Sequence, residues 1–244
     1  FNGCDNVTIF MQLATNGTLA ELICKARQKT ADKKYDNTAR QKILIGIARG
    51  MMFLHQHNVI HRDLKPLNVL LDENLEPHIT DFGLSKKYEI GQTYNQSRSC
   101  GTSIYMAPEV ISSHQYTQKA DVYSFGILMF EVVTDLYPYP ELEDGEMTAF
   151  KLYEQVVHHN YRPKFKYPVK KSIRNLIERC WDKDTKKRPT FEELFDLLSS
   201  NKHEFFYDVF SDEIDCKDDE DGDDNKYYLD DVDDDQVQLY VDDI

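Results

Sequence analysis

Apolar residues that recur every three or four positions form the strongest pattern along the chain. One stripe of this kind consists of Ile43, Ile47, Met51 and Leu54. Residues at this spacing share one face of a helix. The helix is predicted to begin at Thr38, because Thr38 and Gln41 stand in the positions of a capping box. Further helices are expected at 18–28, 121–133, 172–180 and 191–198, the last after a second capping-box pair, Thr190 with Glu193.

Short apolar runs of the β type lie between these helices. They occupy residues 7–14, 59–60, 69–71 and 78–80. The stretch 85–106 is long, polar and rich in hydroxyl groups, so it is predicted to be a loop. Together the patterns predict a mainly α fold with short β segments.

Charge divides the chain into two parts. Residues 201–244 hold 18 Asp and Glu against 3 Lys, whereas residues 1–200 hold 25 acidic and 26 basic side chains. This predicts a folded domain over 1–200 and an acidic, disordered tail over 201–244. The folded part has no strong excess of positive charge, so no nucleic-acid partner is expected.

The cysteines and the apolar runs bear on location. Five cysteines are scattered along the chain without a C-x-x-C pair, which argues against a disulfide framework and a structural zinc site. A reducing, cytoplasmic compartment is the better interpretation. The longest apolar run, 125–133, is interrupted by Glu131 and is too short to span a bilayer, so no membrane association is expected. The sequence leaves the oligomeric state open.

Two polar loops, each beside a β-type segment, carry the residues suited to catalysis. They read His61-Arg62-Asp63-Leu64-Lys65-Pro66-Leu67-Asn68 and Asp81-Phe82-Gly83. Divalent cations prefer oxygen ligands, which Asp81 and the amide oxygen of Asn68 can supply. A carboxylate beside an incoming hydroxyl can orient it and accept its proton, and Asp63 suits that role. Lys65 adds a positive charge, so the set as a whole suits phosphoryl transfer.

Each of these tripeptides alone is weak evidence, but three motifs occur in order. H-R-D-L-K-P-x-N at 61–68 and D-F-G at 81–83 are followed by G-T-x-x-Y-M-A-P-E at 101–109. In this combination the chain resembles the eukaryotic protein kinases, from about Val7 to Leu198. The resemblance implies the helical C-terminal lobe of the protein-kinase fold, with ATP and Mg²⁺ as cofactors and a protein as substrate.

The resemblance further implies a nucleotide site and several structural contacts. The hinge that binds adenine corresponds to Gln12, Leu13 and Ala14, with Met11 gating the pocket and Leu70 forming its floor. Glu109 would pair with Arg188, and Asp121 would hold the backbone of the loop that begins at His61.

A phosphorylation switch is also implied. Arg62 beside the catalytic aspartate is typical of kinases that are activated by phosphorylation of the activation loop. A phosphate there would pair with Arg62 and Lys86. Ser97 and Ser99 are the candidate sites, and Thr93 is a weaker one.

Two sets of residues bear on the kinase type. Lys65 and the Gly101-Thr102 pair are similar to serine/threonine kinases, whereas the segments 123–126 and 179–181 have tyrosine-kinase character. This mixture resembles the tyrosine-kinase-like group of serine/threonine kinases.

One part of the family pattern is missing from the chain. No G-x-G-x-x-G or G-x-x-x-x-G-K motif occurs, and the strand lysine and helix glutamate of the family would lie upstream of Phe1. The N-terminal β lobe is therefore expected to be absent, and the chain alone is expected to bind ATP weakly and to be inactive.

Two other functions remain as alternatives. The chain could act as a pseudokinase or non-catalytic interaction module, although Asp63, Lys65, Asn68 and Asp81 are all present. A small-molecule phosphotransferase is disfavoured by the segment 107–109 with Arg188, because that apparatus presents a peptide.

Overall fold

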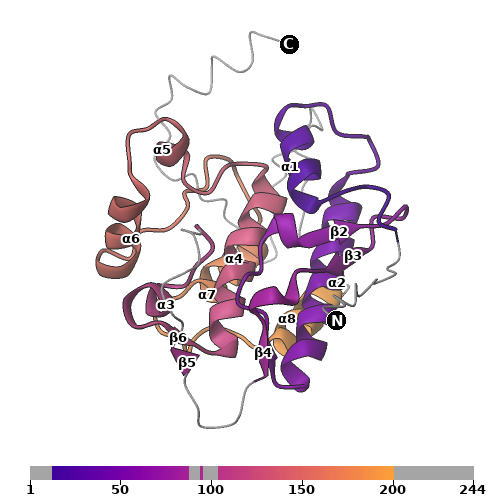
Figure 1. The fold of residues 1–244 in the computed structure, drawn as a ribbon. Coiled ribbons are helices and arrows are strands. Elements are labelled where there is room, and N and C mark those ends of the chain that lie inside the picture. Colours follow the sequence, from indigo (N-terminus) through magenta and orange to yellow (C-terminus); the bar gives the residue numbers. More distant parts are fainter. Residues whose placement is uncertain (1–12, 88–93, 96–103, 201–244) are drawn as a thin grey trace, which may run out of the picture.

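The computed structural model describes residues 13–87, 94–95 and 104–200, and most of its elements are helices (Figure 1). The helices are α1 (Leu19–Arg27), α2 (Asn37–Gln56), α3 (Pro108–Ser113), α4 (Gln118–Thr134), α5 (Pro140–Glu143), α6 (Ala149–His158), α7 (Lys171–Cys180) and α8 (Phe191–Ser199). The strands are β1 (Val59–Ile60), β2 (Val69–Leu71), β3 (Pro77–Ile79), β4 (Lys86–Lys87), β5 (Tyr94–Asn95) and β6 (Gln115–Tyr116), and two short 3₁₀ turns are η1 (Pro66–Asn68) and η2 (Phe82–Leu84). The predicted fold class, mainly α with short β segments, is confirmed.

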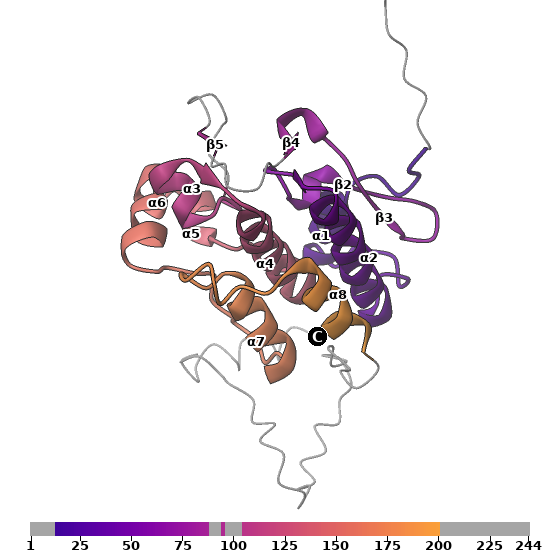
Figure 2. The same ribbon diagram turned by 90° about the horizontal axis from the view of Figure 1, so that it is seen from below.

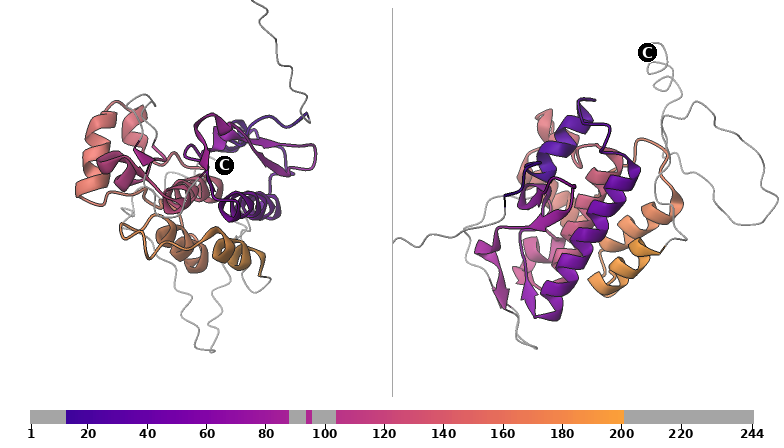
Figure 3. Two further views of the ribbon diagram at one scale, coloured as in Figure 1. Left: turned by 60° about the horizontal axis from the view of Figure 1, so that its bottom comes forward. Right: turned by 90° about the vertical axis from the view of Figure 1, so that its right-hand side faces the viewer.

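Helix α4 forms the centre of the described lobe. It is buried along nearly its whole length, as expected of a helix that is apolar on all sides. Its close approach to α7 depends on Gly126, where an added Cβ would lie 2.8 Å from the Cβ of Cys180. Figures 2 and 3 show α2 and α4 in the middle, with β2, β3 and β4 on one side and α7 and α8 on the other. None of the described helices is long and apolar enough to cross a bilayer.

Helix starts follow the capping rules, and two of them correct the sequence prediction. Helix α4 begins at Gln118 and not at 121, because the Thr117 hydroxyl caps it by accepting from the Lys119 amide. The capping box of Thr190 and Glu193 begins α8 as predicted, and Thr18 caps α1 in the same way. Helix α2, however, begins at Asn37, because the carboxylate of Asp36 accepts a 2.8 Å hydrogen bond from the Ala39 amide. The prediction of a start at Thr38 was therefore wrong. An aspartate earlier in the chain is the better cap, since its charge also favours the helix N-terminus.

Within the described residues the strands form three antiparallel pairs, each of two strands: β1 with β4, β2 with β3, and β5 with β6. Strands β1 and β2 confirm the β-type runs predicted at 59–60 and 69–71, and β3 lies one residue earlier than the run predicted at 78–80. Strands β4 and β5 lie in the stretch that was predicted to be a loop. Each is only two residues long, which is too short to leave a pattern in the sequence.

Two arginines join the first two helices to the end of α4. Asp135, the C-cap residue of α4, accepts two hydrogen bonds from Arg40 of α2, at 2.7 and 2.6 Å. The Arg27 side chain of α1 donates to the carbonyl of the same residue at 2.8 Å. These hydrogen bonds orient α1 and α2 relative to α4. The first polar loop follows α2 in the chain, so its position depends on this orientation.

Candidate active site

The loop between β1 and β2 brings the side chains of Lys65 and Asn68 to one carboxylate oxygen of Asp63. Oδ2 of Asp63 accepts hydrogen bonds from Lys65 Nζ at 2.7 Å and from Asn68 Nδ2 at 2.9 Å. The same Asn68 nitrogen also donates to the Asp63 carbonyl at 2.7 Å. Among the described residues, Oδ1 of Asp63 accepts no hydrogen bond. One oxygen is thus anchored, and the other is left to accept from an incoming hydroxyl group.

The β2–β3 pair places Asn68 beside Asp81. Val69 is paired with Ile79, and the pairing continues one residue further, because the Thr80 amide donates to the Asn68 carbonyl at 2.9 Å. Residues opposite each other in an antiparallel pair lie about 5 Å apart. Asp81 follows directly after Thr80 in the chain, so the backbone of Asp81 lies next to the residue that pairs with Asn68.

These two side chains fit a magnesium ion. The Asn68 nitrogen is used in bonds to Asp63, which turns the amide oxygen away from that carboxylate and leaves it for a cation. Asp81 is exposed and supplies a carboxylate. The described residues hold no group of three or more His, Cys, Asp or Glu that could bind a metal. Magnesium commonly takes one or two protein oxygens and completes its shell with phosphate and water, so the other ligands at a site of this kind would be phosphate and water.

The backbone at Asp81 and Arg62 adopts a conformation that is uncommon for residues other than glycine. The φ angles are 62° at Asp81 and 73° at Arg62. Such positions are held by their surroundings and are concentrated at functional sites. At Arg62 the surrounding group is Asp121, whose buried carboxylate accepts from the Arg62 and His61 amides at 2.9 Å each.

His55 is a further partner of Asp121 that sequence reasoning missed. Its Nε2 lies 2.9 Å from Oδ2 of Asp121, and its ring packs edge-on against Phe191. A histidine in the last turn of a helix carries no signal for such a contact, because the same residue type also suits the helix dipole. His55 therefore ties the end of α2 to the loop that carries Asp63.

His61 connects the two polar loops. Its Nδ1 accepts from the Asp63 amide at 3.3 Å, and its Nε2 lies 3.0 Å from the Thr80 carbonyl. These partners require the neutral ring with its proton on Nε2. The ring also lies edge-on to Phe82, with centroids 5.4 Å apart. Asp63 and Asp81 are thus held in one framework, although 17 residues separate them in the chain.

Glu109 and Arg188 form a paired contact beneath the site. The two Nη atoms of Arg188 donate to the two carboxylate oxygens of Glu109, at 2.7 and 2.9 Å. The arginine side chain has no exposed surface, and it also donates to the carbonyls of Asp182 and Lys119. Four of the five N–H donors of Arg188 are used in these bonds, so the side chain joins α3, α4 and the segment before α8 in a single geometry.

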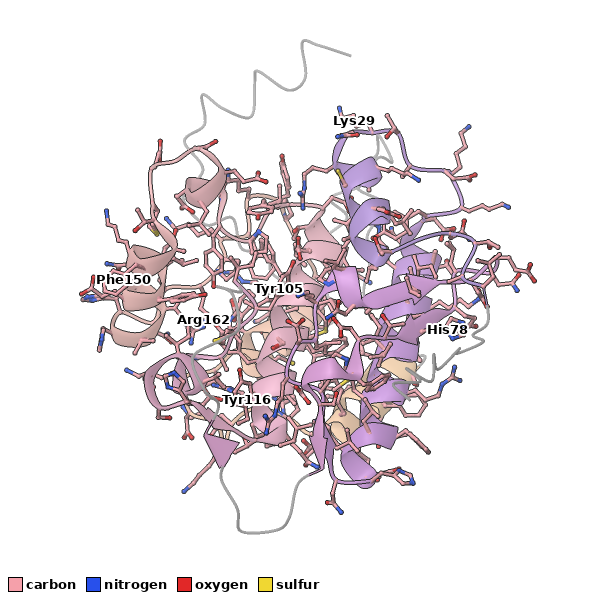
Figure 4. The ribbon with its side chains drawn as sticks, viewed as in Figure 1. Lys29, His78, Tyr105, Tyr116, Phe150 and Arg162 are labelled. Atoms are coloured by element: carbon pink, nitrogen blue, oxygen red, sulfur yellow. The ribbon has the colours of Figure 1, made fainter. Side chains whose placement is uncertain are left out.

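A buried acid near the C-terminal end of α4 was not foreseen. Glu131 on α4 accepts from the Tyr105 hydroxyl and lies 3.5 Å from Arg27. Tyr105 is seen over α4 in the centre of Figure 4. Burial raises the pKa of Glu131 to about 7, although the Tyr105 hydrogen bond and the Arg27 guanidinium both act to lower it. In the sequence, Glu131 only interrupts an apolar run, because its partners are far away along the chain.

We expect this acid to make stability depend on pH. The pKa of Glu131 in the folded chain, about 7, lies above the ordinary value of 4.5. The protonated carboxyl therefore contributes to the free energy of unfolding in full below about pH 4.5, and this contribution is lost as the pH rises through 7. At 1.36 kcal/mol per pKa unit, the loss is about 3 kcal/mol. Urea unfolding near pH 5 and near pH 8 should therefore show a larger drop for the wild-type chain than for Glu131→Gln. The exposed control Glu73→Gln should behave like wild type, and equal drops in all three proteins would contradict this expectation.

The remaining predicted site residues divide into two groups. Leu13 is exposed and Ala14 is half-buried, and the following segment hydrogen-bonds to β2, in which Leu70 lies. Lys86 lies in β4, opposite Ile60. The residues Met11, Gln12, Thr93, Ser97, Ser99 and Thr102 lie outside the described part of the chain.

Comparison with known proteins places the sequence in a family. Residues 1–200 match the model of the protein kinase domain, and the chain therefore belongs to the protein kinase family.

Three relatives illustrate the breadth of the match. A probable serine/threonine-protein kinase of Dictyostelium discoideum is 36% identical over 195 residues, which cover 78% of this chain and 14% of the relative. The dual specificity protein kinase shkD of the same organism is 32% identical over 204 residues, covering 80% and 27%. The serine/threonine-protein kinase STY46 of Arabidopsis thaliana is 39% identical over 157 residues, covering 64% and 26%. The chain thus spans only about a quarter or less of the length of these relatives.

Proposed function

We propose that the chain supplies the metal-holding and acceptor-orienting half of a protein kinase that transfers a phosphoryl group from ATP to serine or threonine hydroxyls of a protein. The observation that carries this proposal is the arrangement around the Asp63 carboxylate. Lys65 and Asn68 both donate hydrogen bonds to it, and the pairing of β2 with β3 brings Asn68 close to Asp81. Two of the relatives described above are named as serine/threonine-protein kinases, which supports the acceptor type.

Each residue has a role that follows from its contacts. Oδ1 of Asp63 orients the acceptor hydroxyl and takes its proton, while Lys65 adds a positive charge on the same side. Asn68 and Asp81 offer oxygen ligands to Mg²⁺, which neutralises the charge of the triphosphate when it is bound. The protein thus contributes positioning and electrostatics, which is what this reaction requires.

The adenine end of the nucleotide is assigned to the first strand-like segment. Leu13 and Ala14, with Met11 and Gln12 before them, would contact the ring through backbone groups, and Leu70 would lie beneath it. This assignment is supported by the hydrogen bonds that hold the Asn16–Gly17 backbone against Leu71.

Further parts of the proposal concern organisation and regulation. The kinase domain would cover 1–200, followed by a tail over 201–244, in a member of the tyrosine-kinase-like group. Phosphorylation at Ser97 or Ser99 would engage Arg62 and Lys86 and order the activation loop. A cytoplasmic location is supported by the free thiols of Cys24 and Cys180 in the described part.

Activity of the chain alone is the first test. Closing a site excludes water and strengthens each charge contact, and the residues of this chain form only one side of the proposed nucleotide site. We expect a radiometric assay with a general protein substrate to show turnover far below the ~1–100 s⁻¹ usual for kinases. Adding an upstream lobe that contains the glycine-rich loop and the strand lysine of the family should restore ordinary turnover. Ordinary turnover by residues 1–244 alone would contradict this part of the proposal.

A further inference from the structure

Positive charge in the lobe is concentrated in one stretch of the chain. Residues 162–187 hold ten Lys and Arg against three Asp and Glu, whereas the rest of 1–200 holds 16 against 22. The site described above uses none of these basic residues.

Packing brings this stretch together on one surface. Phe165 is buried between Phe130 and Trp181, with ring centroids 5.1 and 6.0 Å away, while its neighbours Lys164 and Lys166 are exposed. The guanidinium of Arg174 on α7 lies over the Phe165 ring, 5.0 Å from its centroid. The extended segment around Phe165, helix α7 and the loop after Trp181 therefore lie side by side.

Six exposed cations form what we call the basic face: Lys164, Lys166, Arg179, Lys183, Lys186 and Lys187. In the part of the chain that the structure describes, none of the six forms an ion pair. The acids nearby are already engaged. Glu178 pairs with Arg174 at 2.9 Å, and Asp182 and Asp184 accept backbone N–H groups of the turn at 2.7 and 3.0 Å. The basic face thus presents positive charge that other described groups do not neutralise.

The basic face is separate from the candidate active site. Helix α7 lies on the side of the lobe opposite β2 and β4, as both Figure 2 and the right-hand view of Figure 3 show. A ligand on this face would not compete directly with a nucleotide or an acceptor peptide.

The same chain contains a segment of complementary charge. Residues 212–235 hold 14 Asp and Glu against 2 Lys. We propose that this acidic segment binds the basic face of its own chain. Eleven residues separate Ser200 from Asp212. They reach up to about 40 Å when extended, which is enough to pass across a lobe of this size. A short tether also keeps the effective concentration near the millimolar range, so modest pairing is sufficient.

A second basic stretch is the main competitor on the described surface. Residues 21–36 hold five Lys and Arg against three Asp and Glu. One of the five, Arg27, is already held by Glu131 and Asp135. The local excess is therefore much smaller than at the basic face, and the longer-range attraction favours the latter.

This contact is electrostatic and should respond to salt and to other polyanions. The screening length falls from about 8 Å at physiological ionic strength to about 3 Å at 1 M salt. High salt should therefore release the acidic segment, and an acidic partner protein would compete with it. The inference does not depend on kinase activity, so its failure would leave the proposed function untouched.

Zero-length cross-linking of the full chain tests this contact directly. A carbodiimide joins a lysine amine to a carboxylate as an amide only where the two touch. An equal mixture of isotope-light and isotope-heavy chains separates links within one chain from links between copies. We expect light–light and heavy–heavy links from 212–235 to Lys164, Lys166 and the lysines of 183–187 at low salt, and their loss at 1 M salt. Mixed-isotope links, or links mainly to Lys25, Lys33 and Lys34, would overturn the proposal.

Matched charge reversals complete the test. Lys183→Glu, Lys186→Glu and Lys187→Glu together should lower the yield of links to the unchanged Lys164 and Lys166 roughly fivefold, because three ion pairs are removed. The control triple Lys25→Glu, Lys33→Glu and Lys34→Glu changes the net charge equally and should leave that yield unchanged. When Asp233→Lys, Asp234→Lys and Asp235→Lys are added to the first triple, cross-links should form again. The amines are then at 233–235 and the carboxylates at 183, 186 and 187. Equal effects of the two triples would overturn the proposal.

Discussion

Replacing Asp63 with asparagine is expected to lower the rate of phosphoryl transfer about 10²–10⁴-fold, the usual contribution of positioned proton transfer. The substitution preserves the shape of the side chain and an atom for Lys65 or Asn68 to contact, but it removes the group that takes the hydroxyl proton. Steady-state kinetics in a chain extended by the upstream lobe would measure it. The Michaelis constant for ATP should change little, because Asp63 contacts the acceptor side of the site.

The control for this substitution is Glu73→Gln in the turn between β2 and β3. It removes one carboxylate from the same lobe, and Glu73 is exposed. This variant should keep the wild-type rate. Equal rates for Asp63→Asn and wild type would show that Asp63 does not act on the acceptor.

Loss of Arg188 is expected to have the largest effect on folding. Arg188→Leu leaves Glu109 without its paired donor and removes the hydrogen bonds that Arg188 donates to the carbonyls of Asp182 and Lys119. Breaking a buried ion pair in this way costs about 3–5 kcal/mol. The free energy of unfolding in urea would measure the loss. The exposed pair of Lys42 and Glu76 provides the control, since Lys42→Met should cost about 1 kcal/mol or less.

The double variant separates an ion pair from simple packing. Glu109→Leu together with Arg188→Leu removes both charges, so the double variant should be more stable than Arg188→Leu alone. If the losses of the two single variants simply added, the contact would not behave as a coupled pair.

Periodicity was sufficient to predict the long helices but not the smaller elements. Helix α4 was visible in the sequence because it is apolar on all sides and buried throughout. Helix α6 was not predicted, because only Leu152 and Val156 are buried on it, in a small cluster with Tyr139. Phe150 in the first turn of the same helix remains exposed, at the edge of the lobe in Figure 4. Such a helix owes its place to tertiary packing, which a local pattern does not encode.

The candidate site divides in a similar way. The motifs and their family resemblance named Glu109 with Arg188, a pair 79 residues apart, and the structure brings them into contact. No motif pointed to Glu131, whose partner Arg27 lies 104 residues away and on a different helix. Contacts of that kind depend on how helices pack, so they become visible only in three dimensions.

The central claim is that Asp63, Asn68 and Asp81 converge around a metal-bound triphosphate. Mn²⁺ is a paramagnetic substitute for Mg²⁺, and it broadens the amide signals of nearby residues in the NMR spectrum of the labelled chain. With ATP present, we expect selective broadening at Asn68, Asp81 and Gly83, absent in Asp81→Asn. Broadening confined to the acidic residues of 201–244, or identical with and without ATP, would contradict the claim.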